Sequence, residues 1–269
     1  MKNIEFTNEH LLYVKKVKRE RKLILFLQFG ILIGLLFFWE LFAYLNIIDS
    51  FITSCPSKIF ITIGNLITEY SLFYHIGITL YETIIGFLIA VFLGSAIALA
   101  LWWSERLRRV LEPYIVVLNS LPKIALGPII IVWCGSGSKA IIFMAVLIGI
   151  IVAIMTMLSG FLSIDENKIL LLKSMGANKF QILIKLVIPG SMPTFISMLK
   201  ISVGMAWIGS IMGEYLVSRA GLGYLIVYGG QVFKLDLVMA STVVLCFLAA
   251  IMYLLVALLE KIIIKYKSN

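Results

Sequence analysis

Six apolar segments, each long enough to cross a bilayer as a helix, constrain this chain more than any other feature of its sequence. A transmembrane helix needs about 20 largely apolar residues. With 61% hydrophobic and only 14% charged residues among 269, the chain is too apolar for a soluble domain of this size. The sequence therefore predicts an all-α, polytopic membrane protein with six transmembrane helices at residues 23–47, 83–103, 110–134, 140–162, 194–217 and 237–259.

The segments outside these helices differ in character. Residues 1–22 form a basic tail, and the apolar run that follows is too long for a signal peptide and lacks a small-x-small cleavage site, so we expect it to be retained. Residues 48–82 are loosely amphipathic, and we expect them to lie at the outer interface. Residues 218–236 contain several glycines and predict an outer hairpin.

The basic residues predict the orientation of the chain. With six spans, the segments on the side of the N-terminus carry 17 Lys and Arg residues and those on the other side carry 4. Basic residues concentrate in cytoplasmic loops, so both termini, including the tail 262–269, and the loop 163–193 are expected in the cytoplasm. The net charge of +9 therefore reflects the orientation of a chain that is surrounded by membrane lipid. It does not indicate nucleic-acid binding.

Residues 163–193 mix charge with helical periodicity between two apolar runs. Ser163 and Glu166 have the spacing of a capping box, which predicts the start of a short helix. Gly176 ends that helix, and Asn178 can cap a second one. Pro189, followed by a glycine, is expected to break the second helix before the next span. The product is a bent pair of short helices at the membrane surface.

This segment resembles the signature loop of the integral membrane permeases of ATP-binding-cassette (ABC) importers. Gly176 is followed by nine residues and then Leu186-Val187-Ile188-Pro189, where the family has a glycine, nine residues and Ile-x-Leu-Pro. In that family the loop contains the coupling helix, which docks into a cleft of the ATPase. The resemblance thus implies an ATPase-coupling role for Leu170, Leu171, Leu172, Gly176, Ala177, Leu186, Ile188 and Pro189.

One departure from the family concerns how the ATPase is held. The family's Glu-Ala-Ala triplet, four to six residues before the glycine, is Leu170-Leu171-Leu172 here. The replacement removes an acidic contact but leaves the bend. The alternative interpretation is an ordinary amphipathic connector between two membrane spans.

The resemblance extends from Ser54 to Lys261, with residues 83–261 as the permease core, and is strongest to the nitrate, sulfonate, taurine and bicarbonate group. It implies a type I importer permease fold in a prokaryotic inner or plasma membrane. It also implies a second permease copy or homologue, a cytoplasmic ABC ATPase dimer that carries the ATP and Mg, and an extracytoplasmic solute-binding protein. The implied cargo is a small solute, such as an anion or a thiamine-precursor-like aromatic compound.

Polar residues within the spans are candidates for the substrate pathway. Asn119 and Lys123 lie in the third apolar run, which three prolines interrupt, so it lines a wet path or is a kinked scaffold. Trp207 and Glu214 lie in the fifth, where Glu214 either faces the path or is paired structurally. Lys200 could serve a small anion or lie near the cytoplasmic interface. The acidic residues of the spans are taken to be essentially Glu40 and Glu214.

Enzymes and cofactor sites have little support in the sequence. Residues 135–139 lack the spacing of a phosphate-binding loop, and Cys55, Cys134 and Cys246 are too scattered to indicate a metal site. We therefore expect no catalytic residues, metal or cofactor on this chain. Of His75 and His10, the second lies in the charged tail, so a membrane-embedded enzyme is disfavoured. An ion-coupled secondary carrier remains the alternative transport class.

Overall fold

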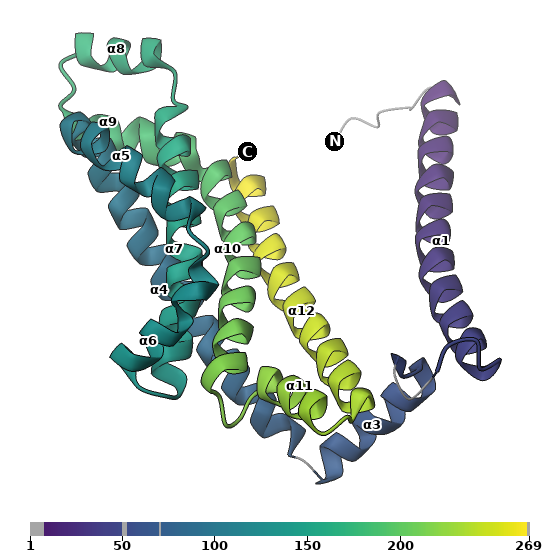
Figure 1. The fold of residues 1–269 in the computed structure, drawn as a ribbon. Helices are drawn as coiled ribbons and strands as arrows, with labels where there is room; N and C mark the ends of the chain where they lie inside the picture. Colours follow the sequence, from purple (N-terminus) through teal and green to yellow (C-terminus); the bar gives the residue numbers. More distant parts are fainter. Residues whose placement is uncertain (1–7, 50–52, 70, 268–269) are drawn as a thin grey trace. The chain divides into compact units, whose positions relative to one another are not determined.

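A computed structural model describes residues 8–49, 53–69 and 71–267 of the chain, and these residues form helices without any strand. The all-α fold class expected from the apolar segments is confirmed. The helices, drawn in Figure 1, are α1 Asn8–Tyr44, α3 Pro56–Glu69, α4 Leu72–Trp103, α5 Glu105–Ser120, η1 Lys123–Leu126, α6 Gly127–Cys134, α7 Ser138–Leu162, α8 Glu166–Ser174, α9 Lys179–Ile182, η2 Leu183–Val187, α10 Ile188–Val217, α11 Leu222–Gln231 and α12 Leu235–Lys267.

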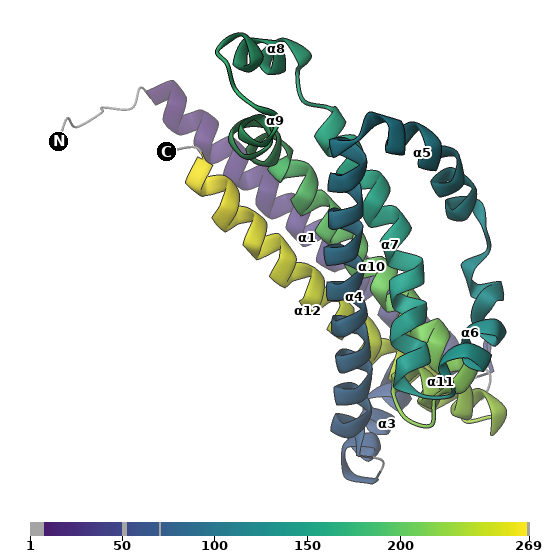
Figure 2. The ribbon, with the colours of Figure 1, turned by 90° about the vertical axis from the view of Figure 1, so that its left-hand side faces the viewer.

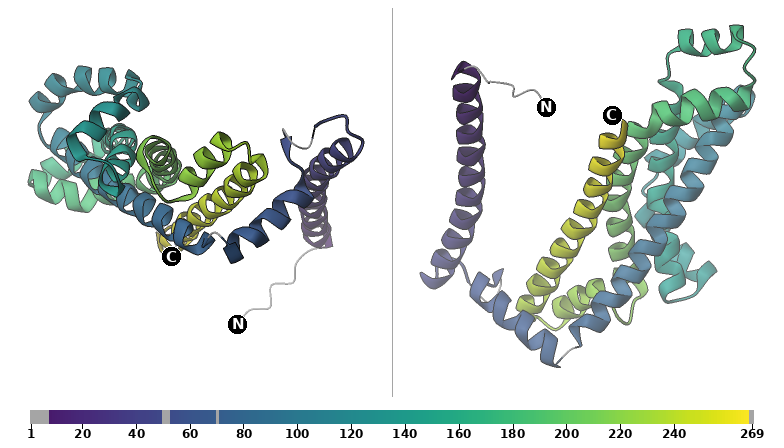
Figure 3. Two further views of the ribbon diagram at one scale, coloured as in Figure 1. Left: turned by 60° about the horizontal axis from the view of Figure 1, so that its bottom comes forward. Right: turned by 180° about the vertical axis from the view of Figure 1, so that it is seen from behind.

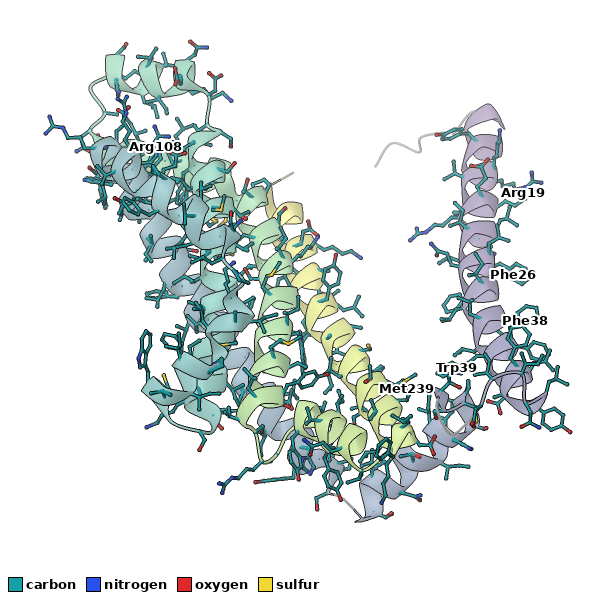
Figure 4. All side chains as sticks on the ribbon, viewed as in Figure 1. Arg19, Phe26, Phe38, Trp39, Arg108 and Met239 are labelled. Atoms are coloured by element: carbon teal, nitrogen blue, oxygen red, sulfur yellow. The ribbon has the colours of Figure 1, made fainter. Side chains whose placement is uncertain are left out.

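The chain divides into two compact units, residues 1–62 and residues 63–269. In the first, α1 is long and apolar enough to cross a membrane, and aromatic side chains such as Phe26 and Phe38 project from it (Figure 4). The carboxylate of Glu40, the one charge in the apolar run 23–47 and close to its far end, accepts hydrogen bonds from the Ser57 backbone N–H at 3.1 Å and from its hydroxyl at 2.7 Å. Glu40 thereby caps the start of α3.

The second unit is built on three long helices, α4, α7 and α10, which lie side by side (Figures 1 and 2). They approach closely because glycine faces alanine where they meet. A Cβ at Gly94 would lie 2.6 Å from the Cβ of Ala153, and one at Gly209 would lie 2.4 Å from the Cα of Ala145. Small residues of this kind are what brings apolar helices into close contact in a membrane.

The remaining helices mark two opposite ends of this bundle. Helices α8 and α9 lie at one end, which we call the loop end, and α6 and α11 lie at the other, which we call the hairpin end (Figure 1). Helix α12 packs against α10 and α11. The glycine-containing segment expected as an outer hairpin thus contains a ten-residue helix, α11.

The third apolar segment is bent instead of straight. Helix α5 and the segment Lys123–Cys134 are bent by 87° relative to each other. The bend lies at Leu121 and Pro122, whose backbone angles are not helical. Proline cannot donate a backbone hydrogen bond and disfavours helix at the residue before it. The described residues therefore contain five helices suited to crossing a membrane, or six if the bent pair counts as one span.

The close approach at Gly209 gives a prediction. Gly209→Ala places a methyl group against the backbone of α7 and should destabilise the protein by about 1–3 kcal/mol, the usual cost of overpacking. Gly204→Ala, on the same helix, meets no atom within 4 Å and is the matched control. Thermal unfolding in detergent, followed by circular dichroism, should show a lower midpoint for Gly209→Ala only. Equal midpoints for both variants would contradict this packing.

Candidate functional site

The helix pair at the loop end begins at Asp165. The Asp165 side chain caps α8 by accepting from the Asn167 backbone N–H at 2.9 Å. The capping box predicted from Ser163 and Glu166 is wrong, because Ser163 terminates α7 and its hydroxyl donates to the Gly160 carbonyl at 2.9 Å. Helix α8 therefore starts two residues later than the sequence pattern indicated.

Gly176 ends α8 as predicted. Its φ is +81°, and its N–H donates to the Lys173 carbonyl while the Ala177 N–H donates to that of Leu172. This is the left-handed C-terminal turn that glycine provides without steric cost. A Cβ at Gly176 would meet no atom within 4 Å, so the backbone angle, and not space, requires glycine here.

Asn178 caps α9, as predicted. Asn178 Oδ1 accepts from the Gln181 N–H at 2.8 Å, and Gln181 Oε1 accepts from the Asn178 N–H at 2.9 Å. The helix then continues through the π-helical segment η2 into α10, with Pro189 in the first turn of α10. The predicted break at Pro189 does not interrupt the helix. The axis instead changes direction between α9 and the body of α10, as Figure 3 shows.

Lys179 holds α9 against the end of α4. Its ammonium group donates to the Trp103 carbonyl and lies 5.5 Å and 5.3 Å from the ring centroids of Trp102 and Trp103. A lysine over an aromatic face is attracted to the negative face of the ring. Lys179 and Trp102 also line a cavity of about 410 Å³ at the loop end, together with Arg108 of α5, which Figure 4 labels.

Beneath α9 lies a cluster of buried apolar side chains that joins five helical segments. Ile182 of α9 and Leu183 and Val187 of η2 pack with residues of α4, α7 and α10. Leu172, Ala177 and Leu186, three of the predicted coupling residues, pack at the edge of the cluster. The buried partners are Ala98, Leu101, Ala153, Ile154, Met157, Leu158, Phe161 and Met198.

Several apolar side chains on the outside of the helix pair are uncovered. Leu170 and Leu171 of α8 are 57% and 62% exposed, Met175 directly after α8 is 74% exposed, and Phe180 of α9 is exposed as well. Ile188 and Pro189 are also exposed. The leucine triplet is therefore divided: two side chains point away from the bundle and Leu172 points into it.

Asn119 and Lys123 lie together at the bend after α5. Lys123 Nζ donates to the Asn119 carbonyl at 3.3 Å and lies 3.5 Å from its side-chain oxygen. Lys200, in contrast, forms an ion pair with Glu260 of α12, with 2.5 Å between Nζ and Oε2. That pairing could not be inferred from residue spacing, because the two residues are 60 positions apart.

Trp207 and Glu214 are both buried within α10. Trp207 packs between α4, α10 and α12 with Phe87, Val203 and Val256, and it is 4% exposed. Glu214 is 1% exposed, and its Oε2 accepts from the Gly223 N–H at 2.5 Å. In a single copy of the chain, both side chains are thus enclosed by neighbouring helices.

Side chains of α4 and α10 hold the start of α11. The Gly221 N–H donates to His75 Nδ1 at 2.9 Å and the Leu222 N–H donates to Thr79 Oγ1 at 2.8 Å. Because the Gly223 N–H donates to Glu214, three successive N–H groups at the start of α11 have hydrogen-bond partners. The first N–H groups of a helix have no partner within the helix, so they need such partners when they are buried. Gly221 must be glycine, because its φ is +115° and a Cβ would lie 2.4 Å from Glu214 Oε2.

One acidic residue near the start of α11 is not among those expected within the spans. Glu82 of α4 is 1% exposed, and its carboxyl group interacts with the Ser138 hydroxyl and the Glu214 carboxyl group. It fell within the segment expected at the outer interface, whereas α4 already begins at Leu72. Among the described residues, no group of three or more His, Cys, Asp and Glu side chains could hold a metal ion.

Comparison with known proteins identifies the family. Residues 86–266 match the profile of the binding-protein-dependent transport system inner membrane component. The chain belongs to this family. Its members are ABC permease subunits in the inner membrane and not catalytic enzymes, which confirms the resemblance drawn from the loop 163–193.

Relatives within the family carry several substrate names. The chain is 24% identical over 86% of its length to a putative aliphatic sulfonates transport permease of Bacillus subtilis, covering 84% of that protein. It is 33% identical over 63% of its length to a formylaminopyrimidine transport permease of Halalkalibacterium halodurans, covering 68% of it. The taurine transport permease of Escherichia coli is 25% identical over 85% of each chain.

A solved structure shares the fold. A chain of the MetNI methionine ABC transporter, in an inward-facing conformation, superposes with a TM-score of 0.65 over 72% of this chain and 97% of that chain, at 18% identity. The architecture is therefore that of a type I ABC importer permease.

The contacts of Lys179 give a second prediction. Lys179→Met removes the tie between α9 and α4, so amide hydrogen exchange in residues 176–187 should become faster. Lys185→Met changes the same charge on an exposed side chain of η2 and serves as control, with unchanged exchange in that segment expected. Identical exchange in the two variants would show that Lys179 does not hold α9.

Proposed function

We propose that this permease docks a cytoplasmic ABC ATPase through the helix pair α8–α9 and moves a small solute inward, driven by ATP hydrolysis in that partner. One observation carries the proposal. The segment that matches the coupling loop is a bent helix pair at one end of the bundle, with uncovered apolar side chains outside and the core cluster inside. A segment that only connects two spans needs neither exposed apolar side chains on its outside nor a buried cluster that joins it to three spans.

The orientation follows from charge. The loop end carries Arg108, Lys173 and Lys179, and the segments expected on its side hold most of the basic residues of the chain. The positive-inside rule then places the loop end and both termini in the cytoplasm. An ATPase dimer, with its ATP and Mg, would meet α8 there.

The geometry offers a route for movement from the ATPase to the spans. Helix α8 is tied to α9 by the turn at Gly176, and α9 continues without interruption through η2 into α10. Lys179 and the apolar cluster connect the same segment to α4 and α7. A displacement of α8 therefore acts on three spans at once, as a switch between two packings requires.

The leucine triplet changes the chemistry of docking. Leu170 and Leu171 project outward where the family has an acidic residue and an alanine, so these two positions offer apolar area in place of that carboxylate. The matching cleft of the ATPase should accordingly be apolar. Burial of such side chains contributes about 25 cal/mol per Å² of area removed from water.

Other partners follow from the family. We propose a pair of permeases, with a second copy or a homologue, and an extracytoplasmic solute-binding protein at the hairpin end. The exposed apolar sides of α4 and α12 face lipid or the second permease.

The cargo is proposed only by class. Relatives are named for aliphatic sulfonates, taurine and formylaminopyrimidine, which are small anionic, zwitterionic or heteroaromatic solutes. For an anion, Lys123 is the candidate within a span, since Lys200 is paired with Glu260. For an aromatic solute, Trp133 offers an exposed ring at the hairpin end.

The turn at Gly176 gives the experiment for this function. Gly176→Val puts a β-branched residue at φ +81°, which costs about 1–2 kcal/mol and should reorient α8. Tagged protein from solubilised native membranes should bring down ATPase activity in wild type and lose most of it in this variant. Gly176→Asn is the matched control, because asparagine tolerates the left-handed region, and it should retain the ATPase.

Two results would contradict the proposal. Wild-type protein that melts cooperatively but brings down no ATPase would make α8–α9 a connector only. Full ATPase recovery with Gly176→Val, in protein that melts as wild type does, would show that the turn plays no part in docking.

A further inference from the structure

Two buried carboxyl groups meet at the hairpin end. Glu82 of α4 and Glu214 of α10 are each 1% exposed, and their carboxyl groups interact with each other. Two ionised carboxylates in contact repel, and burial removes the water that would screen them. The pair therefore needs a positive charge between its oxygens.

The protein does not supply that charge among the described residues. The groups that interact with the two carboxyls are the Thr79 and Ser138 hydroxyls and the Gly223 N–H, all of them neutral. His75, one turn before Thr79, accepts from the Gly221 N–H through Nδ1 and is thus neutral. Arg219 has an exposed side chain, Tyr215 follows Glu214 on α10, and neither forms an ion pair with the carboxyls.

Oxygen atoms of the pair remain unsatisfied. Glu82 Oε2 and Glu214 Oε1 are buried and have no hydrogen-bond partner. Buried acceptors without a partner are rare in folded proteins and point to a missing proton, ion or water. A cavity of about 340 Å³ reaches Glu82 of this pair: Glu82 and Ser138 line it, together with Gly137 and Arg219.

We propose that Glu82 and Glu214 form a binding site for one monovalent cation, either a proton or an alkali-metal ion, reached through this cavity. Both sources provide the same chemistry, a single positive charge shared by carboxyl oxygens. A proton would make one carboxyl the hydrogen-bond donor to the other. An alkali-metal ion would take oxygens from both carboxylates and from the Ser138 hydroxyl.

A cation bound between Glu82 and Glu214 stabilises the start of α11. Glu214 holds the Gly223 N–H through Oε2, and repulsion from an uncompensated Glu82 would push this carboxylate off the helix start. The bound cation therefore couples α4 to α10 and α11. The site does not depend on the ATPase or on transport, so its test is separate from that of the proposed function.

The response to pH has a defined sign. If the folded protein holds an extra proton in the pair, its stability falls as the pH rises, by about 1.4 kcal/mol per pH unit over the range where that proton is lost. His75 contributes the opposite sign, because protonating Nδ1 would break its bond to Gly221, so its stabilising effect is present at higher pH. The two contributions can be told apart.

The experiment measures the melting temperature of the purified full chain in detergent from about pH 6 to about pH 9 in choline chloride, then with sodium or potassium chloride at equal ionic strength. For a bound proton, we expect the wild-type midpoint to fall by about 3–5 °C per pH unit whichever salt is present. For an alkali-metal ion, sodium or potassium should raise the midpoint and choline should not.

The variant Glu82→Gln decides the assignment. Its amide group can donate to Glu214 in place of the bound cation, so the variant should lose the wild-type response to pH or salt and melt higher than wild type at alkaline pH. Glu112→Gln, which removes an exposed carboxylate of α5, should keep the wild-type response. Glu214→Gln is the second variant should Glu82→Gln not fold, and it should lose the response as well.

The proposal is overturned if the wild-type midpoint is independent of pH and of all three salts. It is also overturned if Glu82→Gln, or Glu214→Gln where the first does not fold, responds as wild type does.

Discussion

The close packing of α4, α7 and α10 is the constraint on which the rest of the structure depends. At Gly94 and Gly209, the backbones of α4 and α10 approach alanines of α7 closely. The three spans are therefore tightly packed at these positions. At the loop end, α9 and η2 pack against side chains of the same three helices. At the hairpin end they bring Glu82 and Glu214 into contact and hold the start of α11. Both functional ends thus inherit their geometry from one tightly packed interface.

Local signals in the sequence predicted the loop well. Gly176 and Asn178 act through their own backbone neighbours, a left-handed turn and a capping box, and such interactions can be inferred from residue type and spacing alone. Hydropathy predicted the helical membrane architecture for the same reason, because it depends on composition within each segment. The break expected at Pro189 does not occur, since a proline in the first turn of α10 bends the helical path without ending it.

Interactions between distant segments could not be predicted from the sequence. Lys200 finds Glu260 only after α10 and α12 pack, and Glu82 finds Glu214 only after α4 and α10 do. Each of these residues looked isolated in its own apolar run. Their partners depend on which helix faces are buried, and the helices at issue are apolar on nearly every side, so periodicity did not distinguish the faces. Thr79 and His75 likewise acquire their roles through contacts more than 140 positions away.

The most direct measurement of the central claim, that α8 is the surface that meets an ATPase, is site-specific photo-crosslinking in intact cells. A photoreactive amino acid would replace Leu171 on α8, which is 62% exposed, or Val132 on α6 at the opposite end, which is 82% exposed. The account predicts a crosslink to an ATPase subunit from position 171 and none from position 132. Crosslinking from neither position, or from position 132 alone, would contradict it.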